Sequence, residues 1–143
     1  MTASARPARR RWENRAGWWG ILRWCCAATA VGVLACGAVA AVLHGGPAGL
    51  SALTGGGAVL VLSALTGATT AVAWDRARAA ALPLSVGAFL VKLVLYALLL
   101  ATLRMPEWMS GTAVAVGALV GVVVWQAVEV LVFARTRRGI YAD

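Results

Sequence analysis

The sequence predicts an all-α, polytopic membrane protein with four transmembrane helices arranged as two antiparallel hairpins. Three observations predict this fold class: the composition, four long apolar segments, and basic residues gathered at alternate segment ends. The chain has 143 residues, of which 62% are hydrophobic and 13% are charged, and its mean hydropathy is +0.83. A soluble domain of this size has too much surface to bury so many apolar side chains. The lipid bilayer is therefore the expected surrounding of most of the chain.

Each apolar segment has about 20 or more residues, which is the length that a helix needs to cross the hydrocarbon core. Helices are expected because a helix satisfies all of its own backbone hydrogen-bonding groups inside the lipid. The predicted spans are residues 21–43, 50–73, 84–103 and 112–134. They form one transmembrane domain over residues 20–135, with a basic tail at residues 1–19 and a short tail at residues 136–143.

The segments between the spans contain proline, glycine or charge, which is typical of turns. They read HGGPAG at residues 44–49, WDRARAAALP at residues 74–83, and RMPEWMSG at residues 104–111. Because the last of these is short, we expect the third and fourth spans to be antiparallel neighbours.

Arginine is concentrated in the first tail, in the middle connection and in the last tail, whereas the other two connections carry only Arg104, offset by Glu107. With four spans, all the basic segments lie on one side, so both termini are predicted to be cytoplasmic. Trp108 would mark the outer interface, and the inner interface would be marked by Trp18, Trp19, Trp24 and Trp74. A cleaved signal peptide is the alternative, but the first apolar run exceeds the usual core of about 7–15 residues.

The formal net charge of +8 lies at helix ends and indicates topology, so nucleic acid is not an expected partner. Cys25, Cys26 and Cys36 fall in the first span and are interpreted as small apolar residues. His44 and Asp75 are single ionisable residues at span ends, which we expect to be solvated. The sequence has no catalytic motif, so neither an enzyme, a metal site nor a cofactor is predicted.

Lys92 lies inside the third span, about 12 Å from its cytoplasmic end at 1.5 Å per residue. A lysine at the bilayer centre costs about 2.5–3.5 kcal/mol on insertion scales, so it needs a polar partner. Gln126 and Glu129 share one face of the fourth span at a similar depth, and Tyr96 lies one turn from Lys92. These four residues are the predicted intramembrane polar cluster. It would fix helix register, contact a partner's membrane helix, or line a cation or proton path.

The second span is rich in small residues, which allow helices to approach closely. The candidate helix-packing residues are Ser51, Gly55, Gly56, Gly57, Ser63 and Gly67. Two interpretations stay open: packing within the chain, and docking of another membrane helix.

Three stretches resemble the ATP synthase protein I (subunit I) family, small four-span proteins associated with the bacterial ATP synthase. They are GLSALTGGGAVLVL at residues 49–62, GAFLVKLVLYALLLATLR at residues 87–104, and VVVWQAVEVL at residues 122–131. Lys92 matches the family's lysine in the third span, and Gln126 matches a glutamine that the family often carries. The ending ARTRRGIYAD is similar to the actinobacterial branch.

The resemblance implies a non-catalytic accessory protein of the F-type ATP synthase in the bacterial plasma membrane. Its partners would be the membrane subunits of that enzyme, above all the c subunit, whose rotor ring it would help to assemble or stabilise. The alternative is a small oligomeric cation transporter, which either carries divalent metal ions or is coupled to protons. Lys92 and Glu129 would then lie on its ion path. The sequence is also compatible with a homo-oligomer. A multidrug exporter is less favoured because the first span has no acidic residue.

Overall fold

The structure, a computed structural model, describes residues 16–102 and 104–135, and these residues form helices joined by short connections. Most of the predicted first tail and the predicted tail at residues 136–143 lie outside the described residues, as do the arginines that they contain. The helices are α1 (Gly17–His44), α2 (Gly46–Arg76), α3 (Arg78–Thr102) and α4 (Gly111–Arg135). Because the described part of the chain contains no strand, the prediction of an all-α fold is confirmed.

Three of the helices, α1, α2 and α4, are long and apolar enough to cross a membrane. The apolar stretch of α3 is shorter within the described residues and covers Val86–Leu99. At 1.5 Å per residue this stretch is about 21 Å long, less than the hydrocarbon core of about 30 Å. Three helices of sufficient length and apolar character support the prediction of a membrane protein, whereas the crossing of the bilayer by α3 stays a prediction.

Two of the predicted connections are much shorter in the structure than in the sequence analysis. Gly45 alone separates α1 from α2, and its φ of 92° lies in the region that favours glycine. Pro47 lies in the first turn of α2, where a backbone N–H would have no acceptor within the helix, so its absence costs no hydrogen bond. Ala77 alone separates α2 from α3, and Pro83 lies inside α3. Only the last connection, residues 104–110, is a longer loop.

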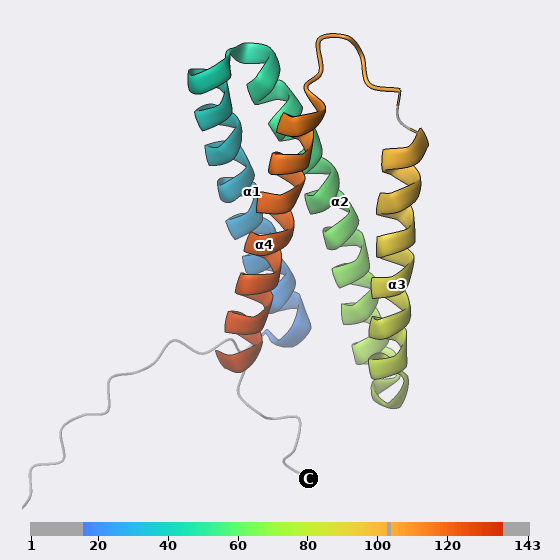
Figure 1. The fold of residues 1–143 in the computed structure, drawn as a ribbon. Coiled ribbons are helices and arrows are strands. Elements are labelled where there is room, and N and C mark those ends of the chain that lie inside the picture. The colour runs from blue at the N-terminus through green and yellow to red at the C-terminus, as the bar shows by residue number, and fades with distance from the viewer. Residues whose placement is uncertain (1–15, 103, 136–143) are drawn as a thin grey trace, which may run out of the picture.

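The helices alternate in direction, so the first described turn of α1 and the last turn of α4 lie at the same end (Figure 1). Helices α1, α2 and α4 pack against one another, whereas α3 packs against α2 and has no direct backbone contact with α4 in the described chain. The expectation that the third and fourth helices pack as neighbours was therefore wrong. The small-residue face of α4 packs on α2 and α1 instead, which leaves α3 on the outside.

Glycines bring the backbones of α2 and α4 into direct contact. A Cβ atom on Gly55 would collide with the carbonyl group of Val114, and one on Gly117 would collide with the carbonyl group of Ala52. On the neighbouring face, Gly56 lies against the side chain of Val33 of α1. This close approach requires residues without side chains and explains why α4 occupies the position beside α2.

The structure places most of the candidate packing residues inside the bundle. Ser51, Gly55, Gly56 and Ser63 are buried, and Gly67 is half-buried against Leu22 and Trp125. Gly57 differs, because the space around it is open. For the buried members, the small-residue face is used for packing within the chain.

Ser51 also joins two helices through its hydroxyl group. Ser51 Oγ donates a hydrogen bond to the carbonyl oxygen of Pro47 at 2.7 Å and accepts one from the backbone N–H of Ser110 at 3.0 Å. Ser110 precedes α4, and its own Oγ accepts a hydrogen bond from the N–H of Ala113. The start of α4 is therefore capped locally and attached to α2, which sets the position of α4 in the bundle.

Candidate functional site

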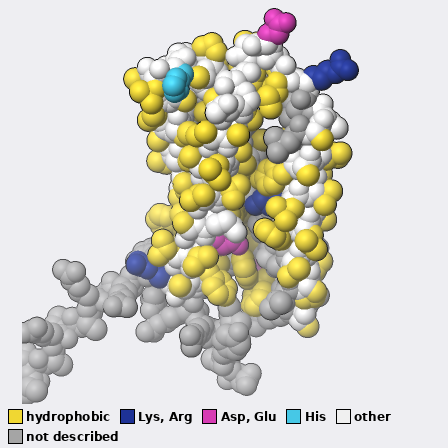
Figure 2. Space-filling view, in the orientation of Figure 1, with side chains coloured by type: hydrophobic (Ala, Val, Ile, Leu, Met, Phe, Trp, Pro, Cys, Tyr) yellow, Lys and Arg dark blue, Asp and Glu magenta, His cyan; other side chains and the backbone are white. Residues whose placement is uncertain are grey.

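A cleft of about 380 Å³ lies in the bundle and is lined by residues of all four helices, including facing parts of α3 and α4. In the space-filling view, side chains of both charge signs show in a hollow that is bordered by hydrophobic side chains (Figure 2). Its polar lining residues are Ser63, Thr66, Thr70, Lys92, Gln126 and Glu129. Its aromatic lining residues are Trp18, Phe89, Trp125 and Phe133. We call this hollow the α3–α4 cleft.

Lys92 is half-buried and projects from α3 into the cleft. Its Nζ lies 5.8 Å from the centre of the Trp125 ring and 5.9 Å from the centre of the Tyr96 ring. Both distances are within the range of a cation–π interaction. Among the described residues Lys92 forms no ion pair and no hydrogen bond. The shared depth of Lys92 and Glu129 would allow a salt bridge between them, but the two side chains form none, although both line one cleft.

Trp125 connects the two charged residues. Its indole Nε1 donates a hydrogen bond of 3.0 Å to Oε2 of Glu129, one turn further along α4. The same ring lies beneath Nζ of Lys92 and is only 4% exposed. The ring face thus interacts with the cation, and the N–H group binds the anion. Sequence analysis did not select Trp125, although its spacing of four residues from Glu129 was visible.

Tyr96 and Gln126 have different roles at the edge of this cluster. The hydroxyl of Tyr96 donates a hydrogen bond of 3.3 Å to the carbonyl oxygen of Val59, which attaches α3 to α2. Gln126 lines the cleft, is exposed, and forms no hydrogen bond with the described residues. Three of the four predicted residues, namely Lys92, Gln126 and Glu129, therefore line the cleft, and Tyr96 supports Lys92 from beside it.

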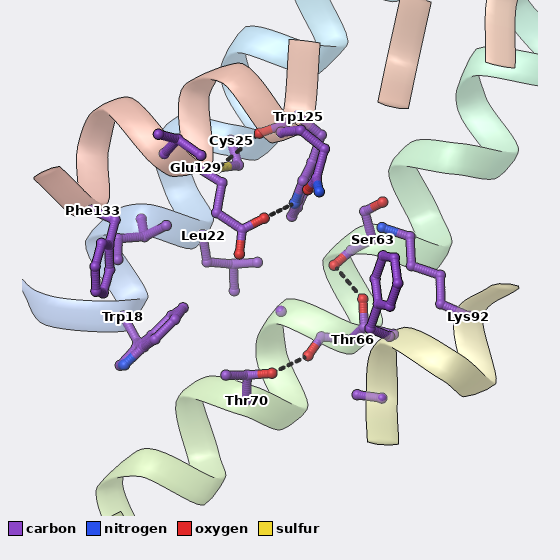
Figure 3. A pocket seen from close by; sticks show the side chains of 16 residues that line it. Trp18, Leu22, Cys25, Ser63, Thr66, Thr70, Lys92, Trp125, Glu129 and Phe133 are labelled. Atoms are coloured by element: carbon purple, nitrogen blue, oxygen red, sulfur yellow. Dashed lines mark hydrogen bonds between the residues drawn. The ribbon is translucent and has the colours of Figure 1, made fainter. Parts of the chain in front are cut away.

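The wall that α2 contributes to the cleft carries hydroxyl groups. Thr66 and Thr70 donate to backbone carbonyl oxygens of their own helix. Ser63 is 1% exposed, and its Oγ has no hydrogen-bond partner of standard geometry, although the Tyr96 hydroxyl is near. In the close view, Ser63 and Lys92 point into the same part of the cleft (Figure 3). Ser63, Lys92 and Gln126 thus line the cleft without hydrogen-bond partners of standard geometry among the described residues, which suits a ligand that accepts hydrogen bonds.

Aromatic side chains gather at the end of the bundle where α1 begins. The ring of Trp18 lies 5.9 Å from that of Trp74 and 6.0 Å from that of Phe133. Trp19 Nε1 donates a hydrogen bond of 2.9 Å to Oδ2 of Asp75. Asp75 is exposed, as expected for an end residue, but it also has this specific partner. Such a cluster is typical of a membrane–water interface.

Neither thiols nor acidic groups form a metal site in the part of the chain that the structure describes. Cys25, Cys26 and Cys36 are free thiols, and Cys25 Sγ lies 3.9 Å from the carbonyl oxygen of Trp125. Cys25 is therefore a packing residue between α1 and α4.

Comparison with known proteins gives no family assignment. Neither the family models, the curated proteins nor the solved structures contain a significant match to this chain.

Proposed function

We propose that the protein is a non-catalytic accessory protein of the bacterial F-type ATP synthase, which helps to assemble or stabilise the ring of c subunits. The proposal starts from the resemblance of residues 49–62 and 87–104 to the subunit I family. It includes a location in the plasma membrane with both termini in the cytoplasm, which the distribution of arginine favours. The basic tail would then lie beside anionic lipid headgroups.

The observation that carries the proposal is the open α3–α4 cleft. Helix α3 packs only on α2 and contains no buried residue among those described, so most of its apolar surface is unpartnered. The glycine face of α2, by contrast, is occupied by α1 and α4. A partner helix would therefore dock along α3 and the cleft rather than on the small residues of α2. An accessory protein that holds a rotor subunit needs such an accessible surface.

A cation transporter is the second candidate, because Glu129 lines the cleft and carboxylates are common on ion paths through membranes. Lys92 lines the same cleft and would repel a cation there, since like charges repel strongly where water is scarce. This places transport second. Cation flux into liposomes that disappears in Glu129→Gln would reverse the order.

The test of the proposed function is the amount of assembled rotor ring in a strain that lacks this gene. We expect less assembled ring in the deletion strain and normal ring when the gene is restored. We also expect the c subunit to co-purify with the protein when the protein is purified gently from native membranes. Normal ring in the deletion strain, together with purified protein free of ATP synthase subunits, would contradict the proposal.

A further inference from the structure

We infer that Lys92 binds a carboxylate that a transmembrane helix of the partner presents inside the α3–α4 cleft. This inference rests on the proposed function, because it describes how the proposed partner is held. It also makes the cleft a binding site of defined chemistry, namely one for an acidic side chain at the depth of Lys92.

The ammonium group of Lys92 lies in the cleft without a hydrogen-bond acceptor among the described residues. An ammonium group has three N–H donors, yet Lys92 meets only the faces of Trp125 and Tyr96. Glu129, the other charged residue that lines the cleft, has one carboxylate oxygen bonded to the indole of Trp125. A cation surrounded by hydrocarbon is unfavourable unless it is paired and hydrogen-bonded. Glu129 balances the charge of Lys92 from across the cleft but does not touch its ammonium group, so the N–H donors of Lys92 stay without an acceptor among the described residues.

Ser63 supports the same inference independently of Lys92. Its hydroxyl is buried on the cleft wall (Figure 3) and has no hydrogen-bond partner of standard geometry, with the Tyr96 hydroxyl nearby. A buried polar group without a partner costs free energy, and a bound hydrogen-bond acceptor would relieve that cost at Ser63. A carboxylate has two oxygens, and these can accept hydrogen bonds from Lys92 and Ser63 together.

The depth of Lys92 and the apolar rim of the cleft favour a helix over a lipid as the source of the carboxylate. Lys92 lies in the middle of the apolar stretch of α3, about 9 Å from its first residue Val86 at 1.5 Å per residue, whereas lipid headgroups lie outside the hydrocarbon core. The side chains around the cleft are apolar and exposed: Phe89 is 50% exposed, Val130 68% and Phe133 55%. A transmembrane helix can cover these side chains with its own apolar residues and present a single acidic side chain at the right depth.

The experiment uses the full-length protein in vesicles of zwitterionic lipid, with two fluorescent synthetic helices of leucine and alanine, each about 20 residues long. The helices differ only at one position level with Lys92, which is Glu in one and Gln in the other. Energy transfer to the labelled protein measures binding. We expect the Glu helix to bind at least about tenfold more tightly than the Gln helix, as a charge-assisted hydrogen bond predicts.

The variants separate the cleft from general charge. The preference for the Glu helix should disappear in Lys92→Met, survive in Lys92→Arg, and weaken in Ser63→Ala. Arg104→Met is the matched control, because it removes a basic residue that does not line the cleft, and it should keep the full preference. Unchanged helix content of each variant, measured by circular dichroism, excludes a loss of fold.

Equal binding of the two synthetic helices by the wild type, or a preference that persists in Lys92→Met, would overturn the inference. Lys92-dependent binding of anionic lipid alone, or Lys92-dependent self-association alone, would overturn it in favour of a lipid or of a second copy. The two proposals fail separately. If the deletion strain has less rotor ring but the wild-type protein does not prefer the Glu helix, only the cleft inference is rejected. If the protein prefers the Glu helix but the deletion strain has normal rotor ring, only the proposed function is rejected.

Discussion

The substitution Gly117→Ala tests the packing that separates α3 from α4. A Cβ atom at position 117 would collide with the carbonyl oxygen of Ala52 and lie 2.8 Å from its Cα, and neither backbone atom can rotate away. The two helices must therefore separate by roughly 1 Å, at an overpacking cost of about 1–3 kcal/mol. Alanine regains about 0.8–1 kcal/mol through its better helix propensity. Because the collision is with backbone atoms, we place the overpacking cost in the upper half of its range, about 2–3 kcal/mol, and expect a net loss of about 1–2 kcal/mol in the free energy of unfolding.

Gly57→Ala is the control, because no atom lies within 4 Å of a Cβ at that position. It should leave the free energy of unfolding unchanged or raise it by up to about 1 kcal/mol. Unfolding by sodium dodecyl sulfate in mixed micelles, followed by tryptophan fluorescence, measures both variants. The reasoning is refuted if Gly117→Ala is as stable as the wild type, or if Gly57→Ala is the more damaging substitution.

Further predictions concern the hydrogen bonds and the topology. Ser51→Ala leaves the N–H of Ser110 without its partner and should lower the free energy of unfolding by about 1–3 kcal/mol in the same assay; an unchanged value would show that water replaces the hydroxyl. Trp125→Phe keeps a ring beneath the lysine but loses the N–H donor, so it should cost about 1–2 kcal/mol and Trp125→Leu more; equal losses would argue against the cation–π contact. In a cysteine-free background, a membrane-impermeant maleimide should label Glu107→Cys on intact cells, and Arg76→Cys only after permeabilisation. Labelling of both from one side would show that α3 does not cross the membrane.

The helices could be predicted from the sequence because the length of an apolar run is a direct physical requirement of the bilayer. The rise of 1.5 Å per residue also predicted that Lys92 and Glu129 lie at a similar depth, and both do line the α3–α4 cleft. The helix ends were harder to place. Glycine and proline near residue 45 indicated a turn, but a single glycine with positive φ is enough to reverse the chain between α1 and α2.

The neighbours of α4 could not be predicted from chain order. A short connection between the third and fourth spans favoured direct packing, but backbone contact through Gly55 and Gly117 brings α4 against α2. The spacing of Gly117 and Gly121 was a signal in the sequence, because small residues four apart form a close-packing face. The role of Trp125 depends on this arrangement, since its ring meets Lys92 across a cleft that only the fold defines.

Photocrosslinking from inside the cleft tests the central claim most directly. A photoreactive phenylalanine analogue replaces Phe89, which lines the cleft, and in a second strain it replaces Val94, which is 66% exposed on the same helix and does not line it. After irradiation of cells that are assembling ATP synthase, we predict an adduct with the c subunit from position 89 and much less from position 94. Adducts from position 89 that contain only lipid or only a second copy of this chain would contradict the account.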